Sequence, residues 1–171
     1  MNKAEFYKVV RKYYGPLSQS QVEGFENLLD EGIKRKARLT EIAYVLATAW
    51  HETAYTMQPI TERGGKYYLM KKPYWPFIGR GYVQLTWEDN YKKYGIEKTP
   101  EKALDPKFAA YIIWDGMTNG VFTGKKLANY FSDKVADFIN ARRIVNGTDR
   151  AVKIAGHARK FLEGLKKADG K

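Results

Sequence analysis

The sequence predicts a mainly α-helical fold with a small β-hairpin lobe. Apolar residues recur at helical spacing over most of the 171 residues. One segment, residues 57–83, interrupts this spacing with three prolines and four glycines and favours a long loop with a hairpin. The chain has no cysteine, so no disulfide framework replaces a hydrophobic core. We therefore expect a single domain, residues 1–171, with a small lobe at about residues 57–86.

Three helices are predicted before the lobe. The first covers residues 3–13 and ends near Gly15. The second lies in "SQSQVEGFENLLDEGIKRK", residues 18–36, which opens with serine caps and has apolar residues at helical spacing. The third lies in "LTEIAYVLATAWHETAY" and is capped by Thr40. Since this third segment is apolar on nearly every face, we expect it to be the central, buried helix.

Helical spacing resumes after the lobe. A helix is expected near Thr86, where Thr86-x-x-Asp89 resembles a capping box. Gly147 stands where a helix stop belongs. Further helices are predicted at residues 106–119, 124–131, 133–145 and 149–167.

The net charge of +11 indicates a polyanionic partner or surface. Nucleic acid, anionic lipid, lipopolysaccharide and an anionic cell wall all fit this charge, and so does a solvated basic surface without a partner. The absence of cysteine fits folding in a reducing cytoplasm. The N-terminal "MNKAEFYKVVRKYYG" has no apolar core of a signal peptide, and we find no apolar run of membrane-spanning length.

Two glutamates ten positions apart have contrasting surroundings. Glu52 ends the most apolar helix, and burial would disfavour its charged form, so it suits a general acid that holds its proton. Glu62 stands beside Arg63 in a polar turn, a setting that favours a charged general base. Both also have ordinary interpretations, since Glu52 can cap a helix or pair with an arginine and Glu62 can be a solvated loop acid.

Metal and cofactor sites are not expected. The pair His51-Glu52 begins the zinc motif His-Glu-x-x-His, but position 55 is Tyr55, so the motif fails. The only other histidine is His157. We therefore predict no metal and no cofactor.

Polar and aromatic side chains near the lobe suit a sugar ligand. In "GRGYVQLTWEDNY", residues 79–91, the alternation around Gln84 and Thr86 predicts a short strand that points both side chains to one face, or else a strand-to-helix junction. A further candidate is Asn146 in "RIVNG", although Asn-Gly is also a common helix stop. An aromatic cluster fits either sugar stacking or a second small core; it comprises Tyr67, Tyr68, Tyr74, Trp75, Phe77 and Tyr82.

Together these segments resemble family 19 glycoside hydrolases, which include chitinases and phage endolysins. The matching segments are "AWHETA", "PITERGG", "GRGYVQLTWEDNY" and "RIVNG", which occur in the family's order within residues 40–147. The resemblance implies a lysozyme-like α+β fold with the hairpin lobe beside an active-site cleft. One departure from the family pattern is Thr148, where a second glycine usually follows the Asn-Gly pair.

The resemblance also implies roles for individual residues. Glu52 would be the general acid, Glu62 the general base of an inverting reaction, and Thr86 would hold the water. The family often has an arginine in its last helix that pairs with the acid, and here His157 or Arg159 is the candidate. The substrate would be contacted by Gln84, Asn90, Asn146, Arg80, Tyr82 and His51.

We predict an endolysin that hydrolyses the β-1,4 bond between amino sugars of bacterial peptidoglycan, a muramidase. The absence of cysteine, the lack of a signal peptide and the basic charge favour peptidoglycan over chitin, because such an enzyme is made in a host cytoplasm and reaches the wall after holin release. The alternatives are a bacterial chitinase of the same family and a basic, non-enzymatic domain that binds the envelope or nucleic acid. No nucleic-acid-binding motif is present, so we expect no nucleic acid partner. We also expect a monomer without a separate wall-binding domain.

The segment 150–171 predicts a basic amphipathic helix. Its apolar stripe can pack on the core and leave solvated lysines. The further hypothesis is that the helix also docks on lipopolysaccharide or an anionic membrane through Lys166, Lys167 and Lys171.

Overall fold

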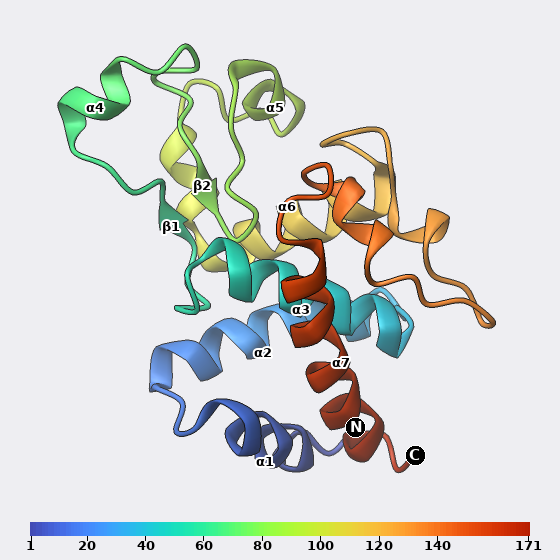
Figure 1. The fold of residues 1–171 in the computed structure, drawn as a ribbon. Helices are drawn as coiled ribbons and strands as arrows, with labels where there is room; N and C mark the ends of the chain where they lie inside the picture. The colour runs from blue at the N-terminus through green and yellow to red at the C-terminus, as the bar shows by residue number, and fades with distance from the viewer.

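A computed structural model describes all residues, 1–171, and consists mainly of helices with one two-stranded antiparallel sheet (Figure 1). The predicted fold class, mainly α with a small hairpin, agrees with this architecture. The α-helices are α1 (Lys3–Tyr14), α2 (Gln19–Lys34), α3 (Leu39–Glu52), α4 (Lys66–Met70), α5 (Glu88–Lys93), α6 (Pro106–Asn119) and α7 (Ala151–Ala168). The strands are β1 (Ile60–Thr61) and β2 (Arg80–Gly81), and the 3₁₀ helices are η1 (Pro100–Leu104), η2 (Leu127–Asn129) and η3 (Asn140–Ile144).

Helix α3 runs through the centre of the molecule, as its apolar sequence predicts. It contacts α2, α6 and α7, and α7 in turn packs against α1 (Figure 1). All residues from Ile42 to Trp50 are buried. The predicted cap at Thr40 is wrong: the helix begins after Arg38, whose backbone N–H donates to the Glu41 carboxylate at 2.9 Å. Helix α3 is therefore the central helix against which α2, α6 and α7 pack.

The predicted lobe is present and contains one element that the sequence did not indicate. Strands β1 and β2 pair with Ile60 opposite Gly81 and Thr61 opposite Arg80. Between them the chain forms the short helix α4, at the upper left of Figure 1, which the turn-rich composition of this segment concealed. The lobe lies beside the helical body, and a cleft separates the two on one side.

The strand predicted around Gln84 is wrong. Gln84 has φ of +57°, and the chain turns there so that Arg80 and Leu85 form an isolated bridge. The capping box predicted at Thr86 is also wrong, since the Thr86 hydroxyl donates to the Gln84 carbonyl at 2.8 Å and α5 begins at Glu88. The alternative interpretation, a junction that leads into a helix, describes this segment.

The helices predicted at residues 124–131 and 133–145 shrink to η2 and η3. The Ser132 hydroxyl accepts hydrogen bonds from the backbone N–H groups of Lys134 and Val135 and so holds a turn between them. Phe131 and Ala136 then pair as an isolated bridge across that turn. By contrast, the helices predicted at residues 3–13, 18–36, 106–119 and 149–167 form with ends shifted by only a few residues.

One contiguous hydrophobic core of 38 buried residues joins the lobe to the body. The apolar stripe of α7 belongs to it, including Ile154, Ala158, Phe161 and Leu165, so packing on the core accounts for this stripe. No helix in the structure combines the length and the apolar character that crossing a membrane requires.

Candidate active site

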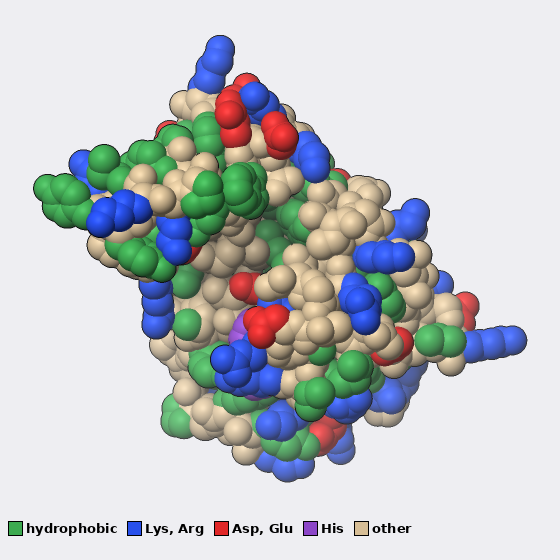
Figure 2. Space-filling view, turned by 45° about the horizontal axis from the view of Figure 1, so that its top comes forward, with side chains coloured by type: hydrophobic (Ala, Val, Ile, Leu, Met, Phe, Trp, Pro, Cys, Tyr) green, Lys and Arg blue, Asp and Glu red, His purple; other side chains and the backbone are tan.

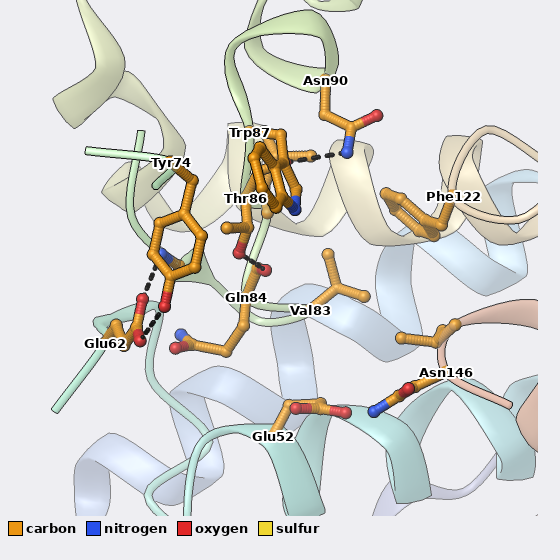
Figure 3. A pocket seen from close by; sticks show the side chains of 13 residues that line it. Glu52, Glu62, Tyr74, Val83, Gln84, Thr86, Trp87, Asn90, Phe122 and Asn146 are labelled. Atoms are coloured by element: carbon orange, nitrogen blue, oxygen red, sulfur yellow. Dashed lines mark hydrogen bonds between the residues drawn. The ribbon is translucent and has the colours of Figure 1, made fainter. Parts of the chain in front are cut away.

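A cleft of about 530 Å³ opens between the lobe and the helical body. Figure 2 shows it as a hollow beside the lobe, with acidic side chains at its floor. Six of the nine predicted site residues line it: Glu52, Glu62, Gln84, Thr86, Asn90 and Asn146. Residues up to 94 positions apart, Glu52 and Asn146, therefore meet in one cavity (Figure 3).

Glu52 reaches the cleft as the last residue of α3. Its side chain is 17% exposed, and its Oε1 accepts a hydrogen bond from the Arg142 guanidinium at 2.8 Å. Arg142 itself is 2% exposed and also donates to the Asp149 carbonyl at 2.8 Å. The apolar helix thus ends in an ion pair. The sequence predicts apolar surroundings for Glu52, but its carboxylate lies beside a guanidinium. The Asn146 amide points toward the same carboxylate (Figure 3).

Arg142 is the arginine that pairs with Glu52, a role that the resemblance predicts for a residue of the last helix. It lies in η3, and neither His157 nor Arg159 of α7 contacts Glu52. The Tyr14 hydroxyl pairs with Nδ1 of His157, and Arg159 lies over the Phe138 ring. The candidates His157 and Arg159 are therefore wrong for a partner of Glu52.

Glu62 follows β1 on the other wall of the cleft. Its Oε1 accepts a hydrogen bond from the Tyr74 hydroxyl at 2.7 Å, and its Oε2 accepts one from the Gly79 backbone N–H at 3.0 Å. Burial and the hydrogen bond to Glu62 raise the pKa of Tyr74 to about 12, so Tyr74 is a neutral donor at physiological pH. Glu62 is held by groups other than those that hold Glu52, and no hydrogen bond joins the two carboxylates.

Gln84 and Thr86 lie between these two acids, on the segment that turns from β2 toward α5 (Figure 3). The Gln84 amide nitrogen donates to the Ile60 carbonyl at 2.9 Å, which leaves its amide oxygen as the group available to a ligand. A Cβ at position 79 would lie 2.9 Å from that oxygen, so a larger residue there would displace the end of the Gln84 side chain. The Thr86 hydroxyl uses its one proton on the Gln84 carbonyl and keeps lone pairs that can accept from water.

Asn90 and Asn146 complete the polar lining. The Asn90 amide donates to the Thr86 carbonyl at 2.8 Å and its oxygen accepts from Lys93 at 3.3 Å, so Asn90 also supports the turn before α5. Asn146 is exposed, and its side chain forms no hydrogen bond within the protein. Its amide is therefore free to contact a ligand.

Three predicted contact residues lie outside the cleft. Tyr82 is 0% exposed in the core and cannot reach a ligand in the cleft. Arg80 donates to the Tyr91 hydroxyl at 2.9 Å, while that hydroxyl donates to the Ile78 carbonyl at 2.6 Å, so Arg80 braces the lobe. His51 is half-buried beside Glu52, and burial lowers its pKa. The structure brings none of the three into the cavity.

Aromatic and apolar side chains add walls that sequence reasoning did not assign to the site. Trp87, which is 52% exposed, stands edge to face with Tyr74 at a ring separation of 5.3 Å. Phe122 lies on the opposite side (Figure 3), and Val145 also lines the cleft. Only Tyr74 of the predicted aromatic cluster lines the cleft, whereas Phe77 and Tyr82 face the core. The cleft thus combines acids, amides and exposed rings.

Backbone strain is concentrated around the cleft. Seven residues other than glycine have positive φ, and five of them follow Glu52 closely or line the cleft. Such conformations cost about 1–3 kcal/mol each and cluster where a fold holds functional groups in place. The five residues are Ala54, Tyr55, Met57, Gln84 and Trp87.

No family model, curated protein or solved structure matches the chain. The structure contains no group of three or more His, Cys, Asp or Glu side chains arranged to hold a metal ion. The chemistry of the site is therefore inferred from its own side chains. Two carboxylates with separate partners face a cavity lined by polar groups and aromatic rings.

Proposed function

We propose that the chain is a glycoside hydrolase that cleaves the β-1,4 bond between amino sugars of bacterial peptidoglycan, with a lysozyme-like fold related to family 19. The observation that carries this proposal is the pair Glu52 and Glu62. They come from different elements, face one cleft and are held by independent partners. Two carboxylates in distinct surroundings are the arrangement that glycosidic cleavage requires.

In the proposed reaction, Glu52 takes up a proton and donates it to the glycosidic oxygen as the bond to the anomeric carbon breaks, and Arg142 pairs with the carboxylate that remains. Glu62 takes a proton from a water that attacks that carbon from the opposite face. Thr86 positions this water through its free lone pairs. Inversion of this kind needs about 6.5–9.5 Å between the carboxyl groups to hold the water. The separate anchoring of Glu62 on the lobe supports such a gap.

The cleft chemistry supports a sugar-chain substrate. Asn146 and the free oxygen of Gln84 offer a donor and an acceptor for hydroxyl and N-acetyl groups, and Trp87 offers an exposed ring for stacking. Peptidoglycan is preferred to chitin because the net charge of +11 suits an anionic envelope. Lipopolysaccharide or an anionic membrane is a proposed additional partner, and the proposed setting is the wall of a host cell after holin release.

The first test is Glu52→Gln and Glu62→Gln assayed on purified peptidoglycan and on chitin oligomers. General acid–base catalysis is worth about 10²–10⁴-fold, so each variant should lose at least about 10²-fold in turnover. Thr86→Ala should lose less because it only positions water. Wild-type protein should release the α-anomer first, as followed by NMR, and release of the β-anomer would contradict inversion.

The ion pair with Arg142 also fits a purely structural role for Glu52, and stability measurements separate the two roles. If Glu52→Gln keeps activity within a few-fold of wild type but lowers the melting temperature, the acid assignment is wrong. If both glutamate variants keep full function, the basic, non-enzymatic binding domain is the better interpretation. Faster cleavage of chitin oligomers than of peptidoglycan would favour the chitinase instead.

A further inference from the structure

The projecting end of the lobe carries a patch of side chains that neither the core nor the cleft uses. We call it the α4 patch, and it consists of Lys66, Tyr67, Tyr68, Met70, Lys71 and Lys72. Figure 2 shows hydrophobic side chains with Lys and Arg side chains among them at this end of the molecule. The patch is separate from the residues that line the cleft.

The apolar part of the patch is unusually exposed. Tyr67 is 83%, Tyr68 56% and Met70 47% exposed, whereas the intervening Leu69 is buried. Surface residues of this size usually bury more of their area, and a contiguous group of them marks an interaction site. Three neighbouring side chains of this short helix are therefore exposed to solvent.

The charge of the patch has one sign. None of its three lysines forms an ion pair, and Lys72 lies over the Tyr68 ring with Nζ 4.3 Å from its centre. The sequence from Arg63 to Trp87 contains no Asp or Glu at all. The surface thus combines tyrosine rings, one methionine and unpaired ammonium groups, without a compensating acid.

We propose that the α4 patch docks on the surface of an anionic phospholipid bilayer. Tyrosine rings favour the boundary between headgroups and acyl chains, because one end is apolar and the hydroxyl stays hydrated. Lysines beside them meet lipid phosphates, and each contributes about fivefold in affinity near an anionic surface. Both parts act together, as in proteins that lie on a membrane without crossing it.

This surface fits a bilayer better than α7 does. The apolar stripe of α7 is buried in the core. The exposed lysines of this helix can attract a bilayer, but the helix has few exposed apolar side chains that could insert. The α4 patch has both kinds of group on one small projection. The inference does not depend on the proposed hydrolase activity, because it uses none of the cleft residues.

The test measures binding of the full chain to sedimented vesicles. Vesicles contain phosphatidylglycerol in phosphatidylethanolamine, or phosphatidylcholine alone. The variant Lys66→Gln/Lys71→Gln/Lys72→Gln should bind the anionic vesicles at least about tenfold more weakly than wild type, since three phosphate contacts are lost. The matched control Lys166→Gln/Lys167→Gln/Lys171→Gln removes the same charge from the other end of the molecule. It should stay within about threefold of wild type. Equal losses in the two variants would mean that net charge alone drives binding, and the proposal would fall.

A second measurement detects insertion directly. Fluorescence of Tyr67→Trp should be quenched by brominated phospholipid, beyond the quenching seen with wild-type protein, because the ring enters the headgroup boundary. The control Tyr111→Trp, at an exposed tyrosine of α6, should show no added quenching. Absence of quenching at position 67 would overturn the proposal. So would a lysine variant that keeps vesicle binding and instead loses binding to purified peptidoglycan, since the patch would then belong to the wall substrate.

Discussion

The carboxylate of Glu62 is oriented by one side chain and one backbone group. The Tyr74 hydroxyl and the Gly79 N–H each hold a different oxygen, so the direction of the carboxylate depends on the lobe keeping its shape. A hydrogen bond from an uncharged donor to a charged group contributes about 1.5–3 kcal/mol. Tyr74 is therefore a positioning residue for the proposed base.

We expect Tyr74→Phe to lower kcat by about tenfold or more while KM changes little, because the base loses its orientation but the ring remains in the wall. Tyr68→Phe is the control, since the Tyr68 hydroxyl makes no hydrogen bond to the protein and the residue lies outside the cleft. Steady-state kinetics on soluble glycan fragments provide the measurement. Equal activity of the two variants would show that the hydroxyl of Tyr74 does not position the base.

The role of Arg142 as the partner of Glu52 could not be predicted from the sequence. Glu52 and Glu62 stand out because their neighbours differ so clearly, one at the end of an apolar helix and one in a turn. Arg142 and Arg143 are adjacent and chemically identical, and only the 3₁₀ turn of η3 makes the first buried and the second exposed. The one signal was an arginine pair inside the otherwise apolar stretch before Asn146.

At the scale of elements, long apolar patterns were predictable and short polar connections were not. Helices α2, α3, α6 and α7 follow from their spacing, since tertiary packing only reinforces a stripe already present. The turn at Thr86 and the segment between α6 and α7 depend on side-chain-to-backbone hydrogen bonds of Thr86 and Ser132, which compete with helix formation. The turn at Gln84 needs a positive φ, and a glutamine side chain does not predict this conformation as a glycine would.

Two glycines within helices provide a paired test of this packing. A Cβ on Gly24 of α2 would overlap the Met57 carbonyl group, whereas a Cβ on Gly156 of α7 meets nothing within 4 Å. Gly24→Ala should destabilise the fold by about 1–3 kcal/mol through overpacking. Gly156→Ala should stabilise it by about 0.5–1 kcal/mol, because alanine is the better helix former.

Denaturant unfolding of both variants measures these changes. Since Met57 follows Glu52 closely, Gly24→Ala should also reduce activity by displacing the end of α3. A Gly24→Ala protein as stable as wild type would show that α2 and the segment around Met57 are less closely packed than the structure has them.

At the scale of the whole molecule, one titratable side chain lies where three helices meet. His157 of α7 pairs with Tyr14 of α1, while Tyr55 and His51 approach it from the end of α3. Burial, then Lys160, Lys153 and His51, lower the pKa of His157 to about 4. The structure therefore keeps this imidazole neutral over most of the physiological range.

Acid should weaken the fold through this residue. The pKa of His157 is about 4 in the folded state and 6.5 in the reference state, so the unfolded chain binds the proton first. Its contribution is fully present above about pH 6.5 and is lost as the pH falls toward about 4. We expect the melting temperature to fall less between about pH 7 and about pH 4.5 in His157→Gln than in wild type. Parallel pH profiles for the two proteins would assign the acid sensitivity to other groups.

The packing of α7 has a consequence for the order in which the protein can be made. Helix α3, the most apolar element, depends for part of its cover on a helix that begins only at residue 151 of 171. During synthesis the ribosome releases α1, α2 and α3 long before α7, and the uncovered apolar surface must wait for it. The backbone N–H of Asn2 donates to the Ala168 carbonyl at 2.7 Å, so this contact between the two ends of the chain can form only after residue 168 has been made. Until then the nascent chain holds both glutamates but not the packed scaffold that aligns them.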